Sequence, residues 1–135
     1  MLTFKNKNRE FVDLFNGLQL VKDLEGVEFG LAVAKNITIL KQKLSALEDI
    51  AKPSEEFVLL SRQATQLKDD VEAIAKLEAD NAESIERRKI HVAEIEELLD
   101  IEVDVELHTV RESILPQNTT ATQIEAINLI IDGDI

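Results

Sequence analysis

Residues 28–74 read EFGLAVAKNITILKQKLSALEDIAKPSEEFVLLSRQATQLKDDVEAI, and their hydrophobic pattern governs the expected architecture. Apolar side chains recur every three or four residues on both sides of Pro53, which places them on one face of an α-helix. The pattern predicts one helix over residues 28–51 and a second that begins after Pro53. Because only one or two residues link the helices, they are expected to fold back as an antiparallel hairpin.

The second arm of this hairpin is the longest predicted element. Pro53 suits the first position of a helix, where its missing N–H group needs no partner. Apolar positions then alternate at intervals of three and four for nearly three heptads, the pattern of a helix that packs against another helix. A single helix over residues 54–98 is therefore expected, about 68 Å long. The alternative is a bend near residues 79–81, because Asp80 and Glu83 have the spacing of a helix cap.

The two arms differ in length, because a helix over residues 28–51 is only about 36 Å long. The distal part of the second arm, residues 78–98, therefore has no partner within the hairpin. Its apolar stripe is expected to be covered either by the C-terminal helix or by another subunit. The stripe consists of Ile85, Val92, Ile95 and Leu99.

Residues 100–110 change from helical spacing to strict alternation, which predicts a half-buried β-strand. Its backbone needs a second strand, supplied either by residues 2–5 or by another chain. The acidic side chains of this strand form one face, interpreted as a solvated surface or as a contact for a basic partner. This acidic face consists of Asp100, Glu102, Asp104 and Glu106. The strand and the uncovered stripe together supply the candidates for a partner interface: Ile85, Val92, Ile95, Leu99, Ile101, Val103, Val105 and Leu107.

Shorter helices are expected near both ends of the chain. Apolar residues recur at helical spacing from Asn8, a suitable N-cap, and Gly26 ends that segment. A C-terminal helix is expected over residues 120–132, because Thr120 opens a capping box and Gly133 suits the position after a helix. The predicted fold is mainly α: a long antiparallel helical hairpin with a short N-terminal helix, one or two short β-strands and a C-terminal helix.

Length and charge indicate how the chain is organised. At 135 residues it fits a single domain, residues 1–135. Residues 1–67 carry nine acids and nine bases, whereas residues 68–106 carry fourteen acids and five bases. All five phenylalanines lie in the first 57 residues. We therefore expect a Phe-centred helical core over residues 1–75 and an acidic extension over residues 76–135.

The sequence contains none of the usual signatures of catalysis or metal binding. It has no cysteine and its four glycines are isolated, which excludes thiol chemistry and a glycine-rich phosphate loop. His91 and Glu94 share one helical face, but the paired motifs of a di-iron helical bundle are missing. The chain is predicted not to be an enzyme and to hold no cofactor and no metal.

Charge also restricts the class of partner. A net charge of −12 argues against direct binding to nucleic acid. No apolar run reaches the ~18–20 residues of a membrane span. The one basic cluster of the acidic half, residues 87–89, is expected to pair with acids one helical turn away, such as Glu83 or Glu86. The remaining class of partner is protein, either a second copy of the chain or a larger protein.

Several of these segments together resemble a group of small, mostly uncharacterised proteins of tailed phages and prophages. Such proteins have a short N-terminal helix that ends in glycine and a long helical hairpin opened by a Phe-x-x-x-x-x-Lys-Asn segment. An alternating acidic strand, a Leu-Pro turn and a short helix with Thr-x-x-Gln follow. The resemblance implies a phage origin, but no activity and no catalytic residue. The matching positions are Gly26, Phe29, Lys35, Asn36, the strand 102–110, Leu115, Pro116, Thr120 and Gln123.

The favoured hypothesis is a non-enzymatic phage structural or assembly protein, such as a capsid- or tail-associated virion component, that works through protein–protein contacts. It would act in the virion or in the host cytoplasm. The uncovered stripe and the strand that needs a partner support this hypothesis, because helix-in-groove binding and β-augmentation use such surfaces. The alternative is an acidic phage inhibitor of a host or defence protein, whose carboxylates imitate the phosphates of nucleic acid.

Overall fold

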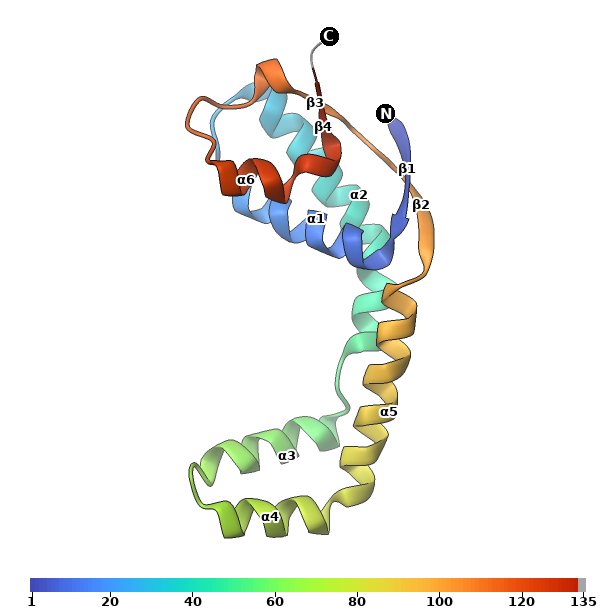
Figure 1. Ribbon diagram of the computed structural model, residues 1–135, viewed down its shortest axis with the longest axis vertical. Coiled ribbons are helices and arrows are strands. Elements are labelled where there is room, and N and C mark those ends of the chain that lie inside the picture. The colour runs from blue at the N-terminus through green and yellow to red at the C-terminus, as the bar shows by residue number, and fades with distance from the viewer. Residues whose placement is uncertain (134–135) are drawn as a thin grey trace. The chain divides into compact units, whose positions relative to one another are not determined.

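A computed structural model describes residues 1–133 of the chain, and the protein is mainly helical (Figure 1). The chain forms two compact units: unit 1 combines Met1–Ala46 with the segment from Leu99 onward, and unit 2 is Leu47–Leu98. The elements in chain order are β1 (Leu2–Lys7), α1 (Asn8–Val21), α2 (Val27–Ala51), α3 (Glu55–Gln66), α4 (Val71–Asp80), α5 (Ala82–Leu99), β2 (Glu102–Leu107), β3 (Val110–Arg111), the 3-10 turn η1 (Glu112–Ile114), α6 (Ala121–Ala126), the 3-10 turn η2 (Asn128–Ile130) and β4 (Ile131–Asp132).

Unit 1 contains a two-stranded antiparallel sheet that joins segments from the two ends of the chain. β1 pairs with β2 from Leu2 opposite Leu107 to Lys7 opposite Glu102. The strand predicted at residues 100–110 is confirmed in its central part. Its partner is the N-terminal segment of the same chain, which was one of the two expected alternatives.

The core of unit 1 is built from residues far apart in the sequence. Phe11 and Phe29 are almost completely buried and are its largest side chains. The C-terminal segment, which was predicted to belong to an acidic extension over residues 76–135, packs into this same core. The predicted boundary between residues 75 and 76 falls inside unit 2. The buried hydrophobic residues of the core are Phe11, Leu14, Leu18, Val21, Phe29, Val33, Leu40, Val105, Leu107, Val110, Ile127 and Ile130.

The predicted helix at residues 28–51 is confirmed as α2, which begins after a glycine turn. Gly26 has a φ of +121°, a backbone conformation that costs little only for glycine. Its carbonyl accepts the first hydrogen bond of α2, from the Gly30 N–H (2.8 Å). Gly26 therefore starts α2, while the preceding helix α1 already ends at Val21.

The C-terminal helix is shorter than predicted. Its start is confirmed: the Gln123 N–H donates to Thr120 Oγ1 (3.2 Å) and the Thr120 N–H donates to Gln123 Oε1 (2.9 Å). Its end at Gly133 is wrong, because α6 stops at Ala126. The chain then extends so that β4 pairs in parallel with β3, and this long-range pairing replaces the last turns of the predicted helix.

Unit 2 replaces the predicted continuous helix over residues 54–98 with three helices, α3, α4 and α5. The break at Asn81 agrees with the alternative bend near residues 79–81. The break after Leu67 was not predicted, and there Lys68 takes a positive φ of 54°. Asp70 then caps α4 by accepting from the Ala73 N–H (3.2 Å). On either side of this turn, α3 and α4 run in opposite directions (Figure 1).

Candidate functional site

Unit 2 buries little hydrophobic surface. Among its residues, all of which the structure describes, Leu60 is the one large apolar side chain that is buried, with 8% of its surface exposed. Hydrophobic burial therefore stabilises unit 2 less than unit 1, and apolar area remains on its surface. The exposed large apolar residues of its helices are Ile50, Leu59, Val71, Ile90 and Val92.

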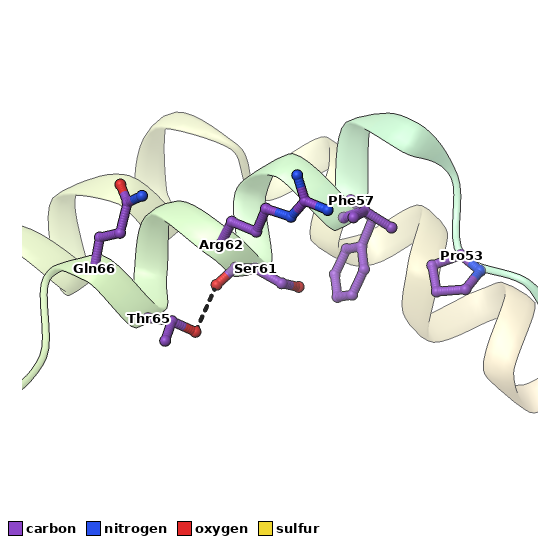
Figure 2. Close-up of a pocket in the computed structure, with 7 residues that line it drawn as sticks. Pro53, Phe57, Ser61, Arg62, Thr65 and Gln66 are labelled. Atoms are coloured by element: carbon purple, nitrogen blue, oxygen red, sulfur yellow. Dashed lines mark hydrogen bonds between the residues drawn. The ribbon is translucent and has the colours of Figure 1, made fainter.

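An open groove with a volume of about 530 Å³ runs along α3 (Figure 2). In Figure 2 the Phe57 ring projects between Pro53 at one end and Gln66 at the other. We call this hollow the α3 groove. It is lined by Pro53, Phe57, Val58, Ser61, Arg62, Thr65 and Gln66.

Local hydrogen bonds fix the backbone that carries the α3 groove. Ser54 caps α3, because its Oγ accepts a hydrogen bond from the Phe57 N–H (3.2 Å). One turn before the end of the helix, Thr65 Oγ1 donates to the Ser61 carbonyl (2.9 Å), as Figure 2 shows. The groove therefore lies on a helix that is tied at its first turn and again near its last.

Arg88 on α5 holds the Phe57 ring in place. Its guanidinium lies 5.7 Å from the ring centroid, within the range of a cation–π interaction. Arg88 Nη1 also donates to the Ala51 carbonyl (3.4 Å) at the C-terminal end of α2 and to His91 Nδ1 (3.1 Å). A positive charge is favourable at the C-terminal end of a helix. Through these contacts the Arg88 side chain connects α5 both to the end of α2 and to the Phe57 ring.

The basic cluster at residues 87–89 makes contacts that the sequence did not predict. Arg87 Nη2 pairs with Glu56 Oε2 at 3.2 Å, on a different helix, and not with Glu83 or Glu86. The expectation of pairing within one helix is therefore wrong for Arg87. The break at Asn81 turns α5 so that its first turns meet α3, which a continuous helix does not allow.

The predicted interface residues divide into three groups by their exposure. Val105 and Leu107 are buried in the core of unit 1, which leaves them inaccessible to a partner in this structure. Val92 and Ile101 remain exposed, at 41% and 50% of their surface. The others, all of them half-buried, are Ile85, Ile95, Leu99 and Val103.

The acidic face of β2 meets basic residues of its own chain. In the register of the sheet, Lys5 lies opposite Asp104 and Lys7 lies opposite Glu102. Opposite charges directly across an antiparallel pair stabilise it by about 0.2–1 kcal/mol. Two basic residues of β1 therefore lie across the sheet from two carboxylates of this acidic face.

The two histidines lie in different environments. His91 accepts from Arg88 in unit 2, while His108 lies between β2 and β3 in unit 1. Burial lowers the pKa of His108 from its ordinary value, and the positive charges of Lys35 and the N-terminus lower it further. Within residues 1–133, no three His, Asp or Glu side chains cluster in a way that would hold a metal ion.

The α3 groove itself was missed from the sequence. The apolar positions that follow Pro53 at intervals of three and four, predicted to pack against another helix, begin with Phe57 and Leu60. In the structure Leu60 is buried, whereas Phe57 lines the groove. The available signal was the positions Phe57, Ser61 and Thr65, which recur every four residues and share one side of α3. Polar residues on one side of a helix usually indicate that this side is exposed to solvent. This signal by itself therefore does not predict a groove.

No protein-family model matches the chain, and comparisons with curated proteins and with solved structures give no match either. None of the helices formed by residues 1–133 combines the length and the apolar character that a membrane crossing needs.

Proposed function

We propose that the protein is a non-enzymatic phage structural or assembly component that works through protein–protein contacts. The sequence resemblance implies only a phage origin, and the assembly role is inferred from the surface of unit 2. One observation carries the proposal: unit 2 has a single buried large apolar residue, Leu60, and presents a groove along α3. A helical unit of this kind gains stability when a partner covers its apolar surface.

The role of each unit follows from this difference in burial. Unit 1 has a core of twelve buried hydrophobic residues and joins both ends of the chain, which suits a stable base. Unit 2 offers the exposed residues Ile50, Leu59, Ile90 and Val92 to a partner. We assign the partner contact to unit 2 and the scaffold to unit 1.

A cross-linking experiment tests the proposal. A photoreactive group placed at Gln66, at one end of the α3 groove, should form a specific cross-link to a protein in particles or in infected cells. The same group at Gln42, an exposed position in unit 1, is the matched control and should form none. Absence of any cross-link from Gln66, together with absence of the protein from purified particles, would contradict the proposal.

A second function is favoured by the exposed carboxylates of α5. Glu86, Glu94 and Glu97 are all exposed on this helix and add to the acidic charge of residues 68–106. An inhibitor that imitates nucleic acid would use them to occupy a basic groove of a host enzyme. Such binding should weaken steeply between low and moderate salt, and reversing the charges of Glu94 and Glu97 should abolish it.

A further inference from the structure

The α3 groove combines an apolar surface with a single charge. Pro53, Phe57 and Val58 supply the apolar lining, and Arg62 supplies the charge. No acidic side chain lines the groove, and in the described part of the chain Arg62 has no ion pair. In Figure 2 the Arg62 side chain extends along α3 toward Phe57. Such a groove favours an occupant with an apolar side chain flanked by carboxylates.

The chain itself carries a surface of this complementary kind. Ile90 on α5 is 53% exposed, so its side chain is accessible to a partner. Glu86 and Glu94 lie four residues before and after it, and Glu97 lies seven residues after it, so all three share its side of the helix. These carboxylates are exposed, and no ion pair holds them within residues 1–133. We call Glu86, Ile90, Glu94 and Glu97 the α5 outer face.

We infer that the α3 groove of one copy binds the α5 outer face of a second copy. Ile90 packs against the ring of Phe57, and the carboxylates of Glu94 and Glu97 surround the guanidinium of Arg62. The inference rests on the proposed protein-contact function and names the partner. Helix-in-groove binding of this type needs an exposed helix with one apolar anchor, and α5 provides it.

The two surfaces are different, and each copy carries one of each. Contacts between unlike surfaces join copies head to tail, as a ring or a filament, or join two copies reciprocally. Copies with a net charge of −12 repel one another, so an association that depends on one arginine is expected to be weak and concentration-dependent. Assembly at high local concentration, as in a particle, fits this behaviour.

Charge reversal on each surface provides the test, with the full chain followed by sedimentation velocity over a concentration series. Wild-type protein should associate reversibly, and Arg62→Glu should weaken the association at least about tenfold, because like charges then face each other. The double variant Glu94→Arg/Glu97→Arg should weaken it in the same way. An equal mixture of the two variants should associate again, since each defective surface then meets an opposite charge.

The matched control is Lys76→Glu, which makes the same charge change at an exposed position of α4. Circular dichroism should show the same helix content for every variant, because all the substituted side chains are exposed. The inference is overturned if the wild type stays monomeric, if Arg62→Glu associates like the wild type, if Lys76→Glu weakens association as much as Arg62→Glu, or if the mixture fails to associate.

The results of the two experiments distinguish failure of the second-copy inference from failure of the proposed function. If the wild type is monomeric but the photoreactive group at Gln66 cross-links to a different protein, the second-copy inference fails and the protein-contact function stands. If the wild type is monomeric, forms no cross-link at all and is absent from purified particles, both fail.

Discussion

The side chain of Asn36 binds both backbone groups of His108. Its Nδ2 donates to the His108 carbonyl (2.8 Å), and its Oδ1 accepts from the His108 N–H (2.8 Å). Asn36 is fully buried in the middle of α2, so these bonds form where water does not compete for them. An amide is the group that can donate and accept in this way at once. The pair fixes the loop between β2 and β3 to α2 and so sets the path of the C-terminal segment.

Replacing Asn36 with Ala should lower the free energy of unfolding by about 2–3 kcal/mol, because two backbone groups lose their partners. Asn36→Asp should also destabilise the protein, since a carboxylate cannot donate to the His108 carbonyl. Urea denaturation measures both effects. Gln42→Ala, at an exposed position of the same helix, should stay within about 0.5 kcal/mol of the wild type. A wild-type midpoint for Asn36→Ala would show that the pair adds nothing to stability.

Two glycines within helices should respond in opposite ways to alanine. A Cβ atom at Gly17 would lie 2.4 Å from the Ala126 carbonyl oxygen, so Gly17→Ala forces α6 away from α1. We expect it to destabilise unit 1 by about 1–3 kcal/mol. No atom lies within 4 Å of a Cβ at Gly30, so Gly30→Ala should stabilise α2 by about 0.5–1 kcal/mol. Thermal unfolding of the two variants side by side checks this, and a gain for Gly17→Ala would contradict the close packing of α6.

Arg88→Ala should loosen unit 2 locally. The substitution removes the cation–π contact with Phe57 and the hydrogen bond to the Ala51 carbonyl, together worth about 1–2 kcal/mol. Hydrogen exchange should therefore speed up in α3 and at the end of α2. Lys89→Ala removes the same charge from an exposed neighbouring position and should leave these rates unchanged. Equal effects of the two substitutions would show that charge alone is responsible.

Stability should fall as the pH drops below 6.5, in part because of His108. Its pKa is lowered in the folded state from the ordinary value of 6.5, so the unfolded chain binds the proton more tightly. The stability that this group contributes is present above pH 6.5 and is lost as the pH falls through the lower, folded-state pKa. His108→Gln should remove this part of the pH dependence, which unfolding midpoints measured over a pH series detect. An unchanged dependence would show that His108 does not contribute to it.

The features that were predicted correctly are those with a local physical cause. Alternation marks β2, and the side-chain and backbone geometry of Thr120 and Gln123 marks the start of α6. Helical spacing marks α2. Each of these depends on residues within a turn or two, so a short window of sequence contains the cause.

The features that were missed are a turn with an unusual backbone conformation and several contacts between distant segments. Lys68 adopts a positive φ, which is rare for lysine, so the residue type does not predict a turn at this position. Gly17 leaves room for the backbone of Ala126, and the guanidinium of Arg87 pairs with the carboxylate of Glu56. In each case the two residues are more than thirty positions apart in the sequence. Phe57, which lines the α3 groove, likewise contacts Arg88 of a separate helix.

By itself, the amino-acid sequence determined that the protein is mainly helical, where its central strand lies and how its charge is distributed, because spacing and residue type act through neighbouring residues. The tertiary structure alone decided that β1 pairs with β2, that Val105 and Leu107 enter the core, and that unit 2 keeps an apolar groove beside Arg62. Strand pairing and burial are settled by which surfaces meet in space, and many arrangements satisfy the same local pattern.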